Sequence, residues 1–344
     1  MTTERRAVVL VGNPAAPYSR GLRIARLLAA GGFAVEIAAI AAAGLPEREE
    51  DGGIVIRRYR PRGPMARMTA TYRDPATAGP RRRPPKFVGV PKRAAAALRR
   101  WAFWPHTVRG WWAALEAELP PADLYHACGS LTIAPALAAR DRHASGPGGG
   151  PARVVYDAID AVTESNNMLG LPAPVRRLIA RRERGWARAA DARITVNDPL
   201  ARLLAARWGT ARPAVVPNYP ELRVRPEPGD RIRAALSLPA STRIVLFQGR
   251  LGPWLGIEEA ERAILELPDT ALVLLGFGRW EEQCRQRDTQ PPFAGRHFTL
   301  PAVHPDALLA WTASADVSII PLPAVSLNQR RSTPNKFWES LAAG

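Results

Sequence analysis

The sequence predicts an α/β protein with two domains, each built on a parallel sheet. Short apolar runs alternate with helical segments along the chain, which is the pattern of strands joined by crossover helices. A cluster of turn-forming residues interrupts this alternation once, at Pro217, Pro220, Pro226, Pro228 and Gly229. A length of 344 residues suffices for two hydrophobic cores. We therefore predict an N-terminal domain over 1–220 and a C-terminal domain over 221–344.

The first domain is predicted to contain seven strands and five helices in alternation. The helix at 20–30 carries Leu22, Ala25, Leu28 and Ala29 on one face. Asp198 is the expected N-cap of the last helix, with Pro199 at its first position. Strands are expected at 7–12, 33–40, 54–59, 123–126, 153–158, 193–196 and 214–216, and helices at 20–30, 92–119, 133–140, 174–190 and 198–208.

The alternation restarts after the Pro cluster. Strands are expected at 243–248, 271–276 and 317–320, and helices at 257–267, 279–287, 307–313 and 335–343. Ligands of open α/β sheets bind at the carboxyl ends of the strands. The segments that follow these strands are therefore the places to look for a site.

The net charge of +17 is concentrated in one segment, 57–112, with fifteen basic residues against a single acid, Asp74. The same segment is rich in aromatic residues, at Trp101, Phe103, Trp104, Trp111 and Trp112. A solvated Arg-rich insertion and an anionic membrane-surface patch both fit this composition. Nucleic-acid binding is disfavoured because no nucleic-acid motif accompanies the charge.

Several protein classes are disfavoured by what the sequence lacks. No apolar stretch reaches the ~20 residues of a membrane span, and an apolar strand follows the first six residues too closely for a signal peptide. Cys128 and Cys284 lie too far apart for metal-ligand spacing or a disulfide framework. We expect a cytoplasmic protein with reduced thiols.

Two glycine-containing segments follow strands of the second domain. In the segment 248–256, Gly249 would let the backbone approach an anion and Arg250 would add a phosphate contact. The alternative is an ordinary strand-to-helix turn with a surface arginine. The Gly276-Phe-Gly278 segment is compatible with close ligand packing or with a plain turn.

The C-terminal segment carries the most specific pattern. Pro334-Asn-Lys-Phe-Trp-Glu339 precedes Leu-Ala-Ala-Gly, and Asp316-Val-Ser-Ile-Ile-Pro-Leu322 lies upstream. These motifs resemble the donor-site region of glycosyltransferase family 4, which has the GT-B fold. The resemblance extends from about residue 7 to residue 344. It implies two Rossmann-like domains with parallel sheets and, because the chain stops at Gly344, an incomplete C-terminal domain.

The resemblance implies a donor site in the second domain. Arg250 and Lys336 would contact the donor diphosphate, and Glu339 would accept the ribose hydroxyls. The backbone contributions would come from Gly249, Gly276, Gly278, Pro334 and Asn335. The chain departs from the family at Leu255, where a basic residue is usual, and at Arg331, where the family has the first Glu of Glu-x7-Glu.

The N-terminal half resembles the family in its landmarks. The segment 123–130 implies that His126 lies near the transferred sugar, and 155–164 implies acceptor-side roles for Asp157, Asp160 and Glu164. The sequence differs from the family's pattern at several polar positions, namely Cys128, Gly129 and Ile159.

The implied activity is transfer of a hexose from a UDP- or GDP-linked sugar to an acceptor hydroxyl, with retention, in bacterial glycan or glycolipid synthesis. The nucleotide sugar would be the co-substrate, and no cofactor or metal is expected. The acceptor would be a glycan or lipid-linked molecule, with the segment 57–112 docking the enzyme at the inner membrane face. The missing family residues and the early end also allow an inactive fragment or a binding protein. A sugar-nucleotide epimerase is disfavoured by the Pro-Asn-Lys-x-x-Glu motif.

Overall fold

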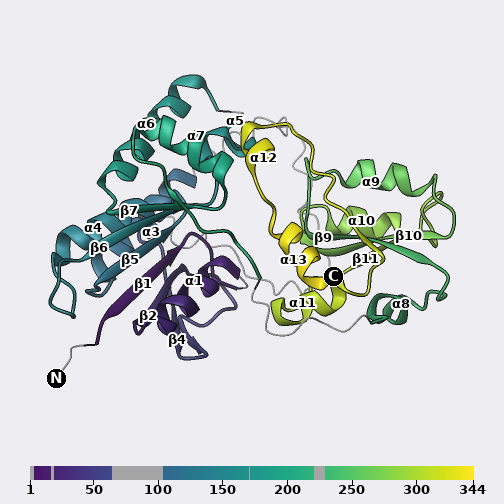
Figure 1. Cartoon of the computed structure of the whole chain (residues 1–344), viewed down its shortest axis with the longest axis horizontal. Coiled ribbons are helices and arrows are strands. Elements are labelled where there is room, and N and C mark those ends of the chain that lie inside the picture. Colours follow the sequence, from purple (N-terminus) through teal and green to yellow (C-terminus); the bar gives the residue numbers. More distant parts are fainter. Residues whose placement is uncertain (1–3, 17–18, 64–103, 170, 221–228) are drawn as a thin grey trace. The chain divides into compact units, whose positions relative to one another are not determined.

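The computed structural model describes residues 4–16, 19–63, 104–169, 171–220 and 229–344. These residues form two compact units, the N-terminal unit ending at Pro217 and the C-terminal unit starting at Asn218 (Figure 1). Most of the basic segment, 64–103, lies outside the described residues. Within the described ranges, every helix is too short or too polar to cross a lipid bilayer.

The N-terminal unit is built on an eight-stranded sheet with the order β3-β4-β2-β1-β5-β6-β7-β8. All neighbouring strands are parallel except β3, which is antiparallel to β4. The order from β4 to β7 is that of a doubly wound Rossmann sheet, and it reverses direction between β1 and β5. The strands are β1 Arg6–Val11, β2 Ala34–Ile40, β3 Arg48–Asp51, β4 Ile54–Tyr59, β5 Leu124–Cys128, β6 Arg153–Ala158, β7 Ala192–Thr195 and β8 Ala214–Val215.

Helices cover both faces of this sheet because its strands are apolar on both sides. Val8 and Leu10 of β1 join one core cluster, whereas Ala7, Val9 and Val11 join the other. This alternation is the period-2 signature of a strand buried on both faces. Helix α1 packs on the second cluster and α3, α4 and α7 on the first. The helices are α1 Ser19–Ala30, α3 Trp104–Glu118, α4 Ile133–His143, α5 Asn166–Leu169, α6 Ala173–Ala189 and α7 Asp198–Trp208, with a 3-10 turn at Val162–Glu164.

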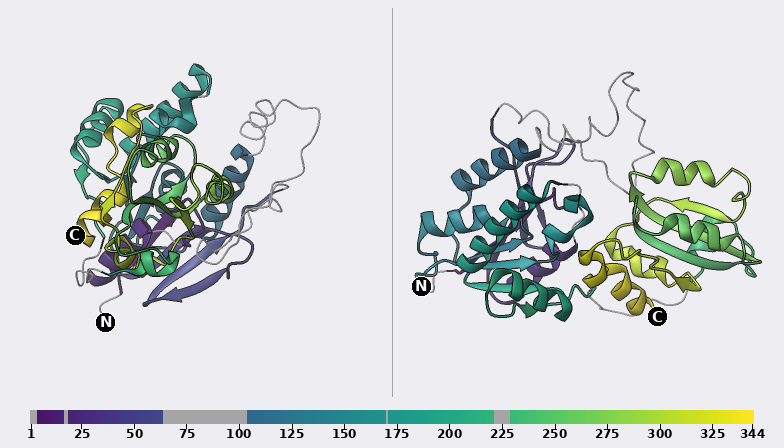
Figure 2. Two further views of the ribbon diagram at one scale, coloured as in Figure 1. Left: turned by 90° about the vertical axis from the view of Figure 1, so that its right-hand side faces the viewer. Right: turned by 90° about the horizontal axis from the view of Figure 1, so that it is seen from above.

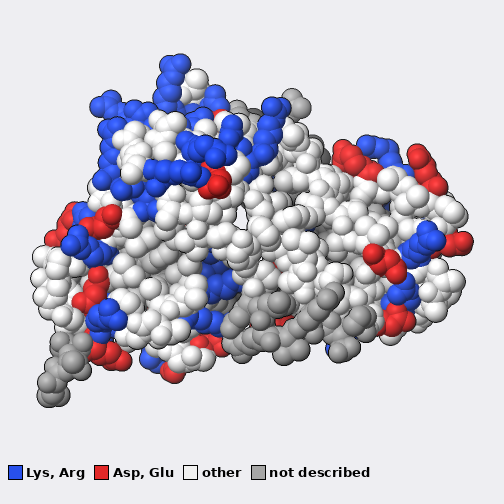
Figure 3. Space-filling view, viewed as in Figure 1, with Lys and Arg blue, Asp and Glu red and all other residues white. Residues whose placement is uncertain are grey.

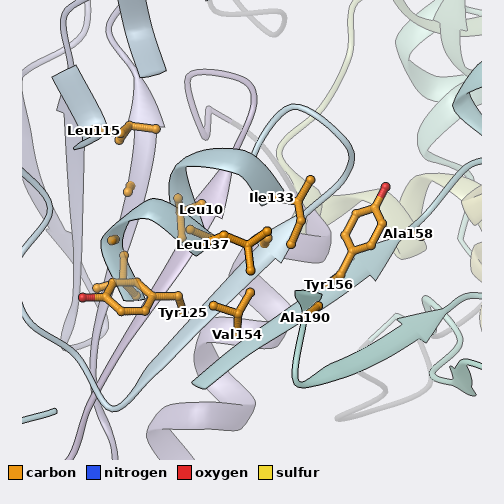
Figure 4. Close-up of a cluster of buried hydrophobic side chains, with 14 of the residues drawn as sticks. Leu10, Leu115, Tyr125, Ile133, Leu137, Val154, Tyr156, Ala158 and Ala190 are labelled. Carbon is orange, nitrogen blue, oxygen red and sulfur yellow. The ribbon is translucent and has the colours of Figure 1, made fainter. Parts of the chain in front are cut away.

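The larger core of the N-terminal unit is aromatic at several points. Figure 4 shows Tyr125 and Tyr156 among aliphatic side chains such as Leu137 and Val154. Both phenols keep a polar partner, since Tyr125 donates to the Pro120 carbonyl at 2.8 Å and Tyr156 donates to Glu183 at 2.9 Å. Buried Tyr is stable here because each hydroxyl is hydrogen-bonded.

The C-terminal unit is a four-stranded, fully parallel sheet with the order β11-β10-β9-β12. Helices α9 and α10 cover one face and α8 and α11 the other, as the views in Figure 2 also show. The order reverses direction between β9 and β12. The elements are α8 Arg231–Leu236, β9 Arg243–Leu251, α9 Ile257–Ile264, β10 Thr270–Gly278, α10 Glu281–Arg287, β11 His297–Leu300, α11 Pro305–Thr312, β12 Val317–Ser318, α12 Leu327–Arg331 and α13 Asn335–Ala343.

The structure corrects several local predictions. Asn197, not Asp198, is the N-cap of α7, because its side chain accepts from the Leu200 N–H at 2.8 Å and Asp198 is already helical. Strand β9 runs to Leu251, so Gly249 and Arg250, which were expected to follow the strand, lie in its last residues, and β10 runs to Gly278. Five elements of six residues or fewer were not predicted, namely β3, α5, α8, β11 and α12.

Candidate functional site

The ends of β9 and β10 approach each other so closely that two positions require glycine. Gly276 lies opposite Gly249, and Gly278 lies opposite Leu251. A Cβ on Gly276 would lie 1.8 Å from the Gly249 carbonyl oxygen, and one on Gly278 would lie 2.0 Å from the Leu251 oxygen. No side chain fits such distances, so these glycines keep the two backbones together and leave the strand ends without side-chain cover.

Arg250 and Gly249 lie at the same strand end. Gly249 has a φ of 108°, a backbone conformation open to glycine. Arg250 is paired in register with Phe277 and its side chain is exposed. It makes no ion pair with the residues that the structure describes. The guanidinium is therefore available for an anion.

Helix α13 brings Lys336 onto this strand end. Its Nζ lies 3.8 Å from the centroid of the Phe247 ring, a cation–π contact. The same Nζ would lie 3.9 Å from a Cβ on Gly249. Burial lowers the pKa of Lys336 to about 8, although the nearby Glu339 acts in the opposite direction. The cation is partly desolvated and lacks a full counter-charge.

Glu339 lies one turn further along α13 and is held by Gln248. The Gln248 Nε2 donates to Glu339 Oε2 at 3.0 Å, and the Thr312 hydroxyl donates to Gln248 Oε1 at 2.6 Å. Gln248 is only 3% exposed. This chain of hydrogen bonds fixes the orientation of the carboxylate.

Gln248 was not among the residues predicted from the sequence to form the site. The available signal was a polar side chain at the end of an otherwise apolar run, Ile244–Phe247. A buried polar residue needs a partner, but the sequence could not identify which one.

The start of α13 is anchored by residues of the same unit. Pro334 is the N-cap residue of α13. Asn218 Nδ2 donates to Asn335 Oδ1 at 2.6 Å, and the Tyr219 ring packs edge-on against Trp338 at 4.5 Å between centroids. These contacts fix the position from which Lys336 and Glu339 project.

The N-terminal unit holds a second polar cluster, around Asp157 at the end of β6. Arg20 binds the carboxylate through two hydrogen bonds, of 2.7 and 2.8 Å, and also donates to the Val216 carbonyl at 3.2 Å. His126 Nε2 lies 3.2 Å from Asp157 Oδ2. All three side chains are buried. Burial acts to raise the pKa of Asp157, but the hydrogen bonds from His126 and Arg20 outweigh it and lower the pKa.

Cys128 lies beside this cluster, and its donor atom, with those of His126 and Asp157, falls within 4.8 Å. The group fits a metal ion poorly. Arg20 already occupies both carboxylate oxygens, and burial raises the pKa of the Cys128 thiol well above its usual value, which disfavours the thiolate that a metal needs. We interpret the cluster as a buried ion pair with a bonded histidine.

The residues predicted for the acceptor side differ in their partners and exposure. His126 and Asp157 are hydrogen-bonded to each other. Glu164 instead pairs with Arg207 at 2.8 Å, and Asp160 is exposed. Arg20 was not predicted as part of this cluster. The signal was a carboxylate in a buried strand, which demands a cation, but the many arginines left its partner unidentified.

The sequence matches no protein-family model and no curated protein. Solved structures are nevertheless similar in fold. The chain shares 18% identity with sucrose-phosphate synthase from Thermosynechococcus elongatus, over 92% of this chain and 76% of that chain, with a TM-score of 0.60. The catalytic domain of starch synthase IV from Arabidopsis thaliana, bound to ADP and acarbose, shares 15% identity over 92% and 78% of the two chains, with a TM-score of 0.58.

A third similar structure is Anabaena HepE in complex with UDP-glucose. Its identity is 14%, over 91% of this chain and 72% of that chain, and the TM-score is 0.57. Similarity at this level establishes the fold. The chain has the GT-B architecture of two Rossmann-like domains, and the predicted fold class is confirmed. The assignment to family 4 and the incomplete C-terminal domain stay predictions.

Proposed function

We propose that the chain is a glycosyltransferase that moves a sugar from a nucleotide-sugar donor to an acceptor hydroxyl. The observation that carries this proposal is the convergence of Lys336 and Glu339 on Gln248 and Gly249 at the carboxyl end of β9. This is the point where the strand order reverses, the usual ligand position in doubly wound sheets. A cation, an oriented carboxylate and an exposed backbone are the groups that a nucleoside diphosphate requires.

Each residue has a defined task in the proposed donor site. Lys336 and Arg250 bind the diphosphate, and Glu339 accepts the two ribose hydroxyls, since a carboxylate has several lone pairs. Gly249, Gly276 and Gly278 let the nucleotide lie against the backbone. The similar structures that hold UDP-glucose or ADP support a nucleotide-sugar donor, and we propose UDP or GDP as its base.

The proposed reaction is a hexosyl transfer with retention. The bond between the anomeric carbon and the diphosphate breaks, a bond to the acceptor oxygen forms, and the acceptor proton is released. Lys336 and Arg250 offset the negative charge that develops on the leaving diphosphate. We propose that this electrostatic stabilisation suffices without a cofactor or metal. His126 is proposed to lie near the transferred sugar.

The acceptor is proposed to be a glycan or a lipid-linked molecule of bacterial glycan or glycolipid synthesis. Asp157, Asp160 and Glu164 are the proposed acceptor-side carboxylates, and among them Asp160 is exposed. The basic segment 57–112 is proposed to hold the enzyme at the cytoplasmic membrane face. Its first and last residues are described, but 64–103 lie outside the described part of the chain.

A second candidate function is nucleotide-sugar binding without transfer. It is favoured by His126, which is only 4% exposed and is already bonded to Asp157. A histidine committed in this way contributes less readily to chemistry at a bound sugar.

A transfer assay separates the two candidates. The chain is incubated with each nucleotide sugar and a panel of lipid-linked and glycan acceptors, and nucleoside diphosphate release and product mass are measured. Acceptor-dependent release that is lost in Glu339→Gln and kept in Glu266→Gln, an exposed control on the same unit, would support the enzyme. Donor binding without release across the panel would favour the binding protein.

A further inference from the structure

Helix α6 of the N-terminal unit exposes charge of one sign. It contains six arginines and one acid, Glu183. Glu183 is buried and accepts a hydrogen bond from Tyr156. The exposed face of the helix therefore carries positive charge alone. Figure 3 shows basic side chains gathered over the part of the unit where Figure 1 places α6.

Four of these arginines follow one side of the helix at intervals of four, three and four residues. They span roughly 16 Å at ~1.5 Å per residue. With Ala180 and Gly185 they line a shallow hollow of about 500 Å³, the arginines being Arg177, Arg181, Arg184 and Arg188. A Cβ on Gly185 would meet nothing within 4 Å, so the hollow is open above this glycine. We call this set the α6 arginine face.

The α6 arginine face is partly preorganised. Arg184 and Arg188 donate to the carbonyls of Arg207 and Trp208 at the end of α7, at 2.8 and 2.7 Å. Arg177 and Arg181 are exposed and make no hydrogen bond or ion pair with other described residues. Guanidinium groups bind phosphate oxygens in bidentate geometry. A row of them with no acid to balance the charge is suited to several phosphates in a line.

An exposed apolar side chain lies on the flank of the α6 arginine face. Leu178 is 51% exposed and lies three and four residues before Arg181 and Arg182, on the same side of the helix. Arginine flanking an exposed leucine is typical of helices at the membrane interface, where the leucine enters the acyl boundary. A larger hollow of about 850 Å³ near β4 differs, because Glu36, Glu47 and Glu118 line it together with arginines.

We propose that the α6 arginine face is a docking surface for the anionic face of a lipid bilayer. The guanidinium groups contact lipid phosphates, and Leu178 inserts between headgroups. An extended row of cations with a leucine beside it fits a surface better than it fits a single small anion. It also fits a lipid better than a nucleic acid, because the one aromatic ring of α6, Trp186, is half-buried and packs edge-on against Trp112, so it offers no open face for base stacking. This surface is distinct from the segment 57–112, and it does not depend on the proposed activity.

Vesicle flotation tests this surface with the whole chain. Phosphatidylcholine vesicles with and without 30 mol% phosphatidylglycerol serve as probes at low and high salt. We expect binding to the anionic vesicles only, weakened by salt. Arg177→Gln/Arg181→Gln is expected to weaken the partition coefficient by about tenfold or more, because each basic residue contributes near an anionic surface. Arg243→Gln/Arg262→Gln, exposed and on the other unit, has the same charge change and should bind as the wild type does.

Three results would overturn the proposal. These are equal binding of the α6 variant and the wild type, equal binding to neutral vesicles, and competition by single-stranded RNA that removes the chain from anionic vesicles through the same arginines. Thermal unfolding of both variants confirms that they are folded. The α6 variant is also titrated with nucleotide. Its donor binding should be unchanged, because the α6 arginine face takes no part in the proposed donor site.

Discussion

Lys336 is held in an environment that disfavours its own charge. Burial against Phe247 lowers its pKa to about 8. Lysine normally titrates near 10.4, so the folded state binds this proton more weakly than the unfolded state does. The charged form is therefore a cost to stability below about pH 8. A bound diphosphate would supply the missing negative charge.

Nucleotide affinity should depend on the protonation of this lysine. If the free site titrates near 8, we expect the dissociation constant for a nucleoside diphosphate to rise about tenfold from pH 7 to pH 9, because the cation is lost. Calorimetric titration at the two pH values measures this. The Lys336→Met variant should bind weakly at both, and a wild-type affinity that does not change with pH would contradict the assignment.

The same substitution should stabilise the fold. Removing a group whose folded pKa lies below its unfolded pKa relieves a penalty that is fully present at pH 7. Lys336→Met should therefore raise the free energy of unfolding at pH 7 by about 1–3 kcal/mol. The gain should disappear as the pH rises through 10.4, where the lysine is neutral in both states. Denaturant melts at pH 7 and pH 10.5 test this, and a destabilised variant at pH 7 would refute it.

The N-terminal unit should be destabilised when one member of the Arg20–Asp157 ion pair is removed, and less so when both are removed. Asp157→Asn leaves a buried guanidinium without its counter-charge, so we expect a loss of about 3–5 kcal/mol in the free energy of unfolding. Arg20→Met/Asp157→Leu removes both charges and should recover most of that loss. Chemical denaturation of the three proteins measures both effects. Equal stability of wild type and Asp157→Asn would show that the pair is not formed.

The sequence predicted candidate residues for the site but not the residues that they contact. Lys336 and Glu339 were identified from a short motif, and the structure places both on the β9 end. Gln248 and Arg20 were missed because each contacts a residue 91 or 137 positions away. Such contacts depend on which strands are neighbours, and local periodicity does not specify that.

At the scale of elements, the pairing of β9 with β10 depends on glycine. Gly276→Ala would place a methyl group 1.8 Å from the Gly249 carbonyl oxygen. We expect a loss of about 3 kcal/mol or more, because backbone rather than a flexible side chain must move. Gly185→Ala in α6 is the matched control. It meets open space, and alanine should stabilise that helix by about 0.5–1 kcal/mol. Thermal melts of both variants measure the two changes in stability. Equal changes in Gly276→Ala and Gly185→Ala would contradict the prediction.

Most elements were predicted within a few residues because their periodicity is strong. The strand at 54–59, the strand at 153–158 and the helix at 335–343 agree with β4, β6 and α13. The elements that were not predicted are all six residues long or shorter. Strand β3 has the sequence Arg-Glu-Glu-Asp and pairs on only one side, at the sheet edge, so no apolar alternation indicates it.

At the scale of the whole molecule, a buried network in the C-terminal unit should make unfolding depend on pH. His297 is fully buried, with Nδ1 at 2.6 Å from Asp288 and Nε2 at 3.3 Å from Glu261. Burial acts to lower the pKa of His297, but Asp288 and Glu261 raise it above 6.5 overall. Burial acts to raise the pKa of Glu261, but His297 and Arg287 lower it below 4.5 overall.

The raised pKa of His297 and the lowered pKa of Glu261 determine how the stability of the fold changes with pH. The contribution of His297 is fully present below its unfolded pKa and is lost as the pH rises through its folded pKa. The contribution of Glu261 is present above its unfolded pKa and is lost as the pH falls through its folded pKa. His297→Gln should therefore destabilise the protein more at pH 5.5 than at pH 8.5, by about 1 kcal/mol or more. Exposed His304→Gln is the control, and equal losses at the two pH values would contradict the network's role.

The central claim is that the β9 end and α13 form a nucleotide-sugar site. The most direct measurement is a calorimetric equilibrium titration of the whole chain with UDP-, GDP- and ADP-linked glucose. The account predicts saturable binding of at least one donor with a stoichiometry near one, and an affinity at least about tenfold weaker in Glu339→Gln, since a buried acceptor for two hydroxyls is lost. Glu266→Gln should bind as the wild type does. Absence of binding by any donor to a cooperatively folded chain, or equal binding by Glu339→Gln, would contradict the claim.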